Sequence, residues 1–100
     1  MTHLASDEIL FQFFAGYFGQ DWTYECDSWQ CVLDTLLRDW PVEEIDELVR
    51  RLQTDFVESD LSDTDLMWKA DSLGFNYRLE VDGFTMRSWL KEAMQYLQRP

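Results

Sequence analysis

The chain has 100 residues, a length at which globular proteins form one domain, because separate hydrophobic cores develop only beyond roughly 250 residues. Hydrophobic residues make up 46% of the chain, against 4 Gly and 2 Pro, which excludes a disordered acidic tail and predicts a single domain over residues 1–100. The formal net charge is −12, and residues 1–49 carry most of it, with 11 acidic residues and one basic residue, Arg38. Such a field repels nucleic acid and anionic membranes and attracts basic proteins. We therefore expect a protein partner, and neither nucleic acid nor membrane.

No segment has the pattern of a targeting or membrane-spanning sequence. The start, Met1-Thr2-His3-Leu4, lacks the basic residues and apolar run of a signal peptide, and no run of about 18 apolar residues occurs. We therefore expect a cytoplasmic protein in which Cys26 and Cys31 remain thiols. Both are expected to be semi-buried small apolar residues, since free cysteine is usually buried.

Hydrophobic periodicity predicts two helices in the first part of the chain. The first begins near Ser6 and presents a wide apolar and aromatic face up to Gly19. The second extends from Trp29 to Trp40, with apolar residues at the spacing i, i+3, i+4, i+7, i+8 and i+11. Asp27 or Ser28 is expected to be its N-cap.

Three further helices are predicted after Pro41. Residues 43–58 have an apolar stripe preceded by two glutamates, which suit the positive end of a helix. Ser62 begins a fourth helix that ends at Gly74, where a C′ glycine is expected, and Thr85 caps a fifth that reaches Leu97. Residues 75–82 lack helical periodicity and form either an ordered loop or one short extended segment. The predicted fold class is all-α, a compact single domain of about five helices with short links.

The sequence shows no pattern typical of catalysis or of metal or cofactor binding. His3 is the only histidine, so a nucleophilic serine or cysteine has no evident base, and the cysteine and histidine spacing fits no zinc site. A calcium loop starting at Asp60 would need glycine and glutamate where the chain has Asp65 and Asp71. No glycine-rich phosphate loop occurs. We therefore expect no enzyme activity, no catalytic residue, no cofactor and no metal.

Four segments together carry a resemblance to a known family. They are Tyr17-Phe18-Gly19-Gln20-Asp21-Trp22, Pro41-Val42-Glu43-Glu44-Ile45, Leu73-Gly74-Phe75-Asn76-Tyr77 and Asp82-Gly83-Phe84-Thr85-Met86-Arg87-Ser88-Trp89-Leu90. With them the chain resembles the immunity proteins of bacterial contact-dependent growth inhibition systems, over about residues 10–97. It departs from the family pattern at Arg78-Leu79, where a proline-containing turn is expected.

The resemblance implies an immunity protein that binds the cognate toxin C-terminal domain and blocks its active site or substrate cleft. Toxins of these systems are often nucleases or RNases, whose clefts must be basic to hold phosphate, and an acidic protein suits such a partner. The alternative is an acidic mimic of nucleic acid that inhibits a DNA-binding protein, which regularly spaced carboxylates on an elongated face would favour. A third alternative is an enzyme that uses Asp and Glu with a bound metal. The oligomeric state is left open.

Two sets of candidate residues follow. A motif shared across a family cannot easily encode recognition of differing toxins, so the motif residues are interpreted as structural: Tyr17, Phe18, Gln20, Asp21, Trp22, Gly74, Trp89 and Leu90. Recognition is assigned to acidic groups expected to be exposed around the third helix and before the fourth: Asp39, Glu43, Glu44, Asp46, Glu47, Asp55, Glu58, Asp60, Asp63 and Asp65. Several aromatic residues near helix ends either pack there or are exposed for binding, among them Trp22, Tyr24 and Trp68.

Overall fold

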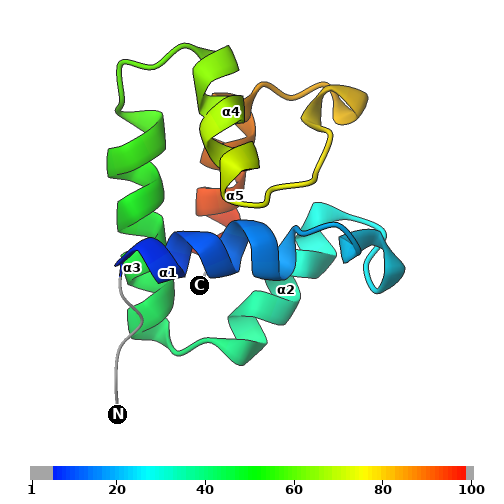
Figure 1. Cartoon of the computed structure of the whole chain (residues 1–100). Coiled ribbons are helices and arrows are strands. Elements are labelled where there is room, and N and C mark those ends of the chain that lie inside the picture. The colour runs from blue at the N-terminus through cyan, green and yellow to red at the C-terminus, as the bar shows by residue number, and fades with distance from the viewer. Residues whose placement is uncertain (1–5, 99–100) are drawn as a thin grey trace.

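The computed structural model describes residues 6–98, which form five α-helices and no strand (Figure 1). The α-helices are α1 (Ser6–Phe11), α2 (Trp29–Asp39), α3 (Val42–Leu52), α4 (Asp63–Ser72) and α5 (Met86–Leu97). Two π-helical segments extend α1 and α3 without a break, η1 (Gln12–Tyr17) and η3 (Gln53–Val57). Two short 3-10 helices complete the described part, η2 (Trp22–Tyr24) and η4 (Leu79–Asp82). The predicted all-α fold of about five helices is confirmed.

Local capping explains where three of the helices begin. The side chain of Ser28 accepts a hydrogen bond from the backbone N–H of Cys31, and that of Ser62 accepts one from Asp65, each at 3.2 Å. Thr85 and Ser88 form a reciprocal capping box at the start of α5. Each cap satisfies a backbone donor that has no partner inside its helix, so short-range sequence signals locate these helix starts.

Residues 75–82 form an ordered loop that ends in η4, so the loop is the one of the two predicted alternatives that occurs. The backbone N–H of Asn76 donates to the carbonyl of Phe18 at 2.8 Å, which ties the loop to the chain after η1. Because this contact is a single bond to a turn and not to an extended strand, no ladder develops.

Helix α5 occupies the centre of the domain. It packs against α2, α3, α4 and η3, while α1 packs across α3 on the side that faces the viewer in Figure 1. Buried side chains from every α-helix meet in one hydrophobic core, and the largest of them, Trp89 of α5, is fully buried. None of the helices in residues 6–98 is long and apolar enough to cross a membrane.

The prediction that Cys26 and Cys31 are thiols is wrong, because the structure joins them in a disulfide. The turn between η2 and the first turn of α2 brings their Cα atoms to 5.5 Å, which lies within the range that a disulfide requires. The bridge fixes the η2 segment to the start of α2. Both residues are half-buried, as the sequence predicted.

Candidate functional site

The two motif segments that are farthest apart in the sequence meet in one aromatic cluster. The ring of Phe18 lies edge-on to Trp89, with centroids 5.2 Å apart, and 5.7 Å from the ring of Phe75. Trp22 packs against Tyr77 with a centroid distance of 5.2 Å. Edge-to-face pairs at these distances add to the stabilisation that burial provides. The cluster packs the start of η2 and the loop before η4 against α5.

The predicted structural residues differ in their exposure. Three are buried in the core, namely Phe18, Trp89 and Leu90, and two are half-buried, namely Tyr17 and Trp22. Gly74 adopts the left-handed conformation, with φ +97°, at the end of α4. Gln20 and Asp21 are exposed, so the first motif also contributes to the surface.

The acidic residues around α3 fall into two kinds. Asp39, Glu43 and Asp46 are exposed. The prediction that Glu44 is exposed is wrong, since only 9% of it is accessible. Helical spacing explains this burial, because Glu44 precedes the buried Leu48 by four residues and lies on the same face of α3.

Glu47 is half-buried and is neutralised by a neighbour on its own helix. The guanidinium of Arg50 donates to both carboxylate oxygens of Glu47, one of them at 3.1 Å from Nε. This hydrogen bond and the positive charge of Arg50 lower the pKa of Glu47. A carboxylate that is already paired adds less to the field that a partner meets.

Some of the acidic residues from η3 to α4 form hydrogen bonds within the protein, and others do not. Asp55 accepts from Arg51 Nε at 2.8 Å, and Glu58 accepts from the amide of Gln53 at 2.7 Å. Asp60 and Asp65 are exposed. In the described residues no hydrogen bond or ion pair to either of these two carboxylates is formed, so they remain available to a partner.

Asp63 has a structural role as a helix cap. Its carboxylate oxygens accept from the backbone N–H groups of Met86, at 3.1 Å, and Arg87, at 3.0 Å, and so cap the start of α5. The Arg87 side chain reaches back to the carbonyls of Val57, Ser59 and Leu61 at 3.0–3.1 Å. These bonds hold the turn that carries Asp60.

Trp68 is a large aromatic residue on the surface of α4, where 77% of it is exposed. Asp65 and Asp71 precede and follow it by three residues, so both lie on its side of the helix. An exposed tryptophan bordered by charged groups is a composition that protein interfaces favour.

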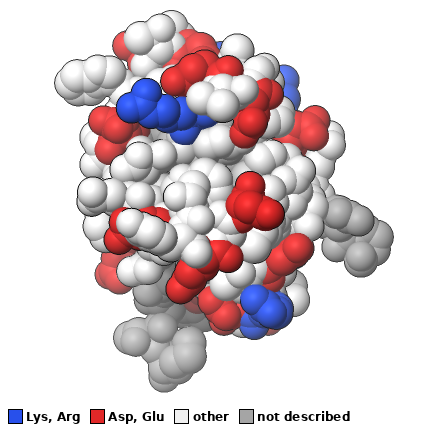
Figure 2. Space-filling model, turned by 90° about the vertical axis from the view of Figure 1, so that its right-hand side faces the viewer, with Lys and Arg blue, Asp and Glu red and all other residues white. Residues whose placement is uncertain are grey.

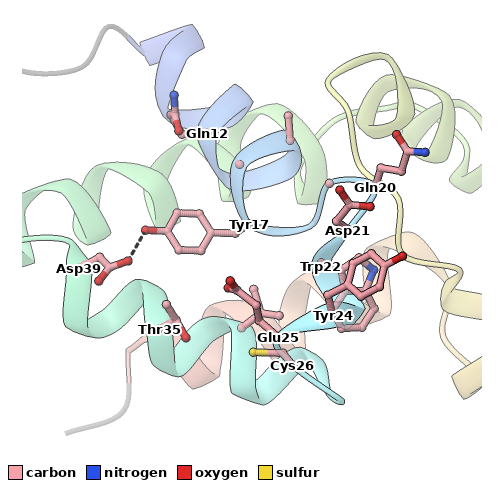
Figure 3. Close-up of a pocket in the computed structure, with 14 residues that line it drawn as sticks. Gln12, Tyr17, Gln20, Asp21, Trp22, Tyr24, Glu25, Cys26, Thr35 and Asp39 are labelled. Atoms are coloured by element: carbon pink, nitrogen blue, oxygen red, sulfur yellow. Dashed lines mark hydrogen bonds between the residues drawn. The ribbon is translucent and has the colours of Figure 1, made fainter.

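A pocket of about 800 Å³ lies between η1, the η2 segment and α2 (Figure 3). Gln12 and Tyr17 line it from the η1 side, and Thr35 and Asp39 from α2. The remaining wall comes from the segment between these helices, which includes Gln20, Asp21, Trp22, Tyr24, Glu25 and Cys26. Of these residues, the sequence predicts a binding role for Asp39 and leaves Trp22 and Tyr24 as aromatic residues that either pack on a helix end or are exposed for binding.

The hydroxyl of Tyr17 donates to the carboxylate of Asp39 at 3.0 Å, a hydrogen bond between two residues that line the pocket (Figure 3). Burial and this hydrogen bond to a carboxylate raise the pKa of Tyr17 to about 12. Tyr17 also packs edge-on against Trp40, with ring centroids 5.8 Å apart. The ring is therefore held between the end of η1 and the end of α2.

No local sequence pattern points to Glu25 or Thr35, because a pocket wall joins elements whose relative placement is decided by the tertiary packing. Tyr24 carried the one available signal, an aromatic residue in a short link between helices. The structure leaves 85% of it exposed.

Acidic side chains outnumber basic ones on the face that carries η2 and η4. Figure 2 shows this face, with Asp and Glu spread over it and Lys and Arg confined to a few places. The surface therefore presents a negative field to an approaching molecule, in agreement with the charge of the whole chain.

Within residues 6–98, no group of three or more His, Cys, Asp or Glu side chains is placed to hold a metal ion. His3, the single histidine, lies outside the described residues.

Comparison with known proteins places the chain in a family. The model of the family described as CdiI immunity protein matches residues 7–97. No curated protein and no solved structure shows significant similarity to the chain. The match covers nearly all of the described helices, including all four segments that carry the resemblance and the acidic residues of α3 and α4. The chain therefore belongs to the CdiI immunity protein family.

Proposed function

We propose that this protein is a non-enzymatic inhibitor that binds and neutralises the cognate toxin C-terminal domain of a contact-dependent growth inhibition system. The observation that carries the proposal is the family match over residues 7–97. The family implies a toxin-neutralising immunity function, and the exposed acidic and aromatic side chains provide the surface that such an inhibitor needs.

The partner that best suits this surface is a basic nuclease or RNase domain. A nuclease must hold a phosphate backbone, so its substrate cleft is lined by lysine and arginine. The net charge of −12 and the acidic face of Figure 2 complement such a cleft. Binding at the cleft blocks the active site by excluding substrate and needs no chemistry from the inhibitor.

Two surface clusters are proposed to guide the toxin during association. The first consists of Asp39 at the end of α2 with Glu43 and Asp46 in the first half of α3, and the second of Glu58, Asp60 and Asp65 around the start of α4. Glu44, Glu47, Asp55 and Asp63 contribute less, since they are buried, paired or used as a cap. Long-range attraction by exposed charges mainly raises the association rate.

The alternative of a nucleic-acid mimic receives less support from the shape of the molecule. Regularly spaced carboxylates on an elongated face would favour a nucleic-acid mimic. The domain measures 37 × 31 × 26 Å, so no axis is much longer than the others. Several carboxylates are also turned inward or neutralised by arginine.

The direct test is to coexpress the chain with the toxin domain encoded immediately upstream of its gene. A stable one-to-one complex, with loss of toxicity and loss of nuclease activity, supports the proposal. A toxin domain from an unrelated system is the control and should remain active. If the purified proteins do not associate and cells are not protected, the immunity function of this chain is refuted.

Association rates measured at increasing salt concentration test the electrostatic part. We expect the rate to fall as salt rises, because salt screens exposed charges over a Debye length of about 8–10 Å. Reversing one cluster, with Glu43→Lys and Asp46→Lys or with Asp60→Lys and Asp65→Lys, should slow association and leave the fold intact. A rate that depends neither on salt nor on either pair would contradict steering by these clusters.

A further inference from the structure

The pocket between η1, the η2 segment and α2 has the size of a binding site. Its volume of about 800 Å³ lies within the range of about 300–1,000 Å³ that is typical of pockets that bury whole ligands. It can therefore hold one or two long side chains of a partner.

The lining of the pocket combines negative charge with aromatic rings. Asp21, Glu25 and Asp39 contribute carboxylates, and no lysine or arginine is among the lining residues of the described chain. Tyr17, Trp22 and Tyr24 contribute rings from two sides, as Figure 3 shows. Carboxylates accept the hydrogen bonds of a cation, and aromatic faces attract it through their negative quadrupole.

Two cross-links constrain the walls of the pocket. The Cys26–Cys31 disulfide ties the η2 segment to α2, and the Tyr17–Asp39 hydrogen bond ties η1 to the other end of that helix. Gly16 and Gly19 form part of the lining and project no side chain into the space. Pre-organised walls lower the entropic cost of ordering the site when a partner binds.

We propose that this pocket receives one or two arginine or lysine side chains from a projecting segment of the toxin domain. The inference rests on the proposed function and extends it, because it names the anchoring site and the chemistry of the residue that it binds. A protein side chain is favoured as the occupant because Tyr24, at the pocket, is 85% exposed, and exposed tyrosines are frequent anchors of protein interfaces. Arginine fits best, since its planar guanidinium both stacks on rings and pairs with carboxylates in two-point geometry.

The pocket and the surface clusters then have separable effects on binding. Asp39 belongs to both, so the first cluster leads directly into the pocket. Exposed charges at the periphery mainly set the association rate, whereas a desolvated anchor mainly sets the dissociation rate. The two roles can be distinguished by kinetics.

The test uses three changes to the pocket in the full chain, each measured for binding to the purified toxin domain. Asp21→Asn with Glu25→Gln removes two charges, Tyr24→Ser removes an exposed ring, and Gly16→Leu fills the space without changing charge. Gly16 has no positive φ, and the nearest obstacle to a Cβ atom is the flexible end of the Gln12 side chain, 2.9 Å away. A leucine at this position can therefore be accommodated by movement of Gln12.

Matched controls lie on the exposed surface of α5. Glu92→Gln removes a carboxylate and Gln95→Leu adds the same side chain as the filling variant, and neither residue lines the pocket. Thermal unfolding verifies that every variant is folded. We expect each pocket variant to raise Kd by roughly 30-fold or more, mostly through faster dissociation, since interface anchors typically have effects of this size. The controls should stay within about threefold of the wild type.

The outcomes separate the two proposals. If the wild type does not bind the toxin domain, the proposed function fails. If the wild type and all folded pocket variants bind equally tightly, the function stands and the anchoring site is refuted. If spermidine raises the melting temperature of the wild type and not of the pocket variants, while toxin binding is unaffected, the pocket serves a small cation and the proposal is also overturned.

Photo-crosslinking identifies the toxin segment that lies at the pocket. A photo-crosslinking phenylalanine analogue placed at Tyr24 should attach to the toxin, and mass spectrometry then identifies the labelled peptide. We expect a surface segment with an arginine or lysine within two or three residues of the attachment point. Attachment to a segment without basic residues would overturn the assignment.

Discussion

Gly74 lies directly against Ala15, so that a Cβ atom on Gly74 would stand 2.5 Å from the Cβ of Ala15. This contact joins the end of α4 to η1 and brings residues 75–82 beside the first motif. Gly74 also has φ +97°, a conformation that side chains other than glycine rarely adopt. The Leu73–Tyr77 segment therefore has its glycine for two reasons, one of backbone conformation and one of packing.

Gly74→Ala should destabilise the protein by about 2–4 kcal/mol, because overpacking adds to the cost of the left-handed conformation. Gly83 is the matched control, since it has φ +80° with nothing within 4 Å of a Cβ atom. Gly83→Ala should therefore cost only about 1 kcal/mol. The free energies of unfolding in urea measure both values. If both variants lose the same free energy of unfolding, the contact between Gly74 and Ala15 does not contribute to stability.

Asp63→Ala should lower the free energy of unfolding by about 1–2 kcal/mol, the typical effect of removing a helix cap. The reason is that two backbone N–H groups of α5 lose their carboxylate acceptor. Asp60→Ala, at an exposed residue of the same turn, should change stability by no more than about 0.5 kcal/mol. An effect of Asp63→Ala on toxin binding without an effect on stability would contradict the structural role.

Reduction of the Cys26–Cys31 disulfide should lower the free energy of unfolding by up to about 2 kcal/mol, because the bridge closes a short loop and so restricts the unfolded chain. Urea unfolding with and without dithiothreitol measures the effect. The double variant Cys26→Ala, Cys31→Ala is the control and should not respond to reductant. An unchanged wild type under full reduction would contradict the prediction.

Alkaline pH should weaken the fold through Tyr17. Its pKa is raised to about 12 by burial and by the hydrogen bond to Asp39, so the folded state holds the phenolic proton more tightly than the unfolded state does. This contribution is complete below the unfolded pKa of about 10 and is lost as pH rises through the folded pKa. After allowance for solvent screening at a half-buried residue, the loss amounts to about 1–2 kcal/mol.

The measurement is the free energy of unfolding of the wild type and of Tyr17→Phe at several pH values between about 9 and 12. Tyr17→Phe should be less stable near neutral pH and should decline less steeply above about pH 10. Tyr77, whose pKa is also raised by burial and by its hydrogen bond to Asp82, remains in both proteins and accounts for the decline that is left. Identical slopes would refute the contribution of Tyr17.

The sequence by itself determined the helices, because their signals are short-range. The caps at Ser28, Ser62 and Thr85 satisfy backbone donors within three residues, and apolar spacing identifies the faces that are buried. The glycine at the end of α4 was predictable for the same reason. The net charge, and with it the expectation of a basic partner, also requires no coordinates.

Only the tertiary structure decided which acidic groups are available and where a pocket forms. The carboxylate of Asp63 accepts hydrogen bonds from backbone N–H groups 23 and 24 positions later in the chain. The pocket lies between η1, η2 and α2, and no local sequence pattern predicts the path of the turn that brings them together. The Cys26–Cys31 bridge depends on the same turn. Contacts of this kind arise when helices pack, because the packing of the core and not the charge of a residue determines which side chains meet.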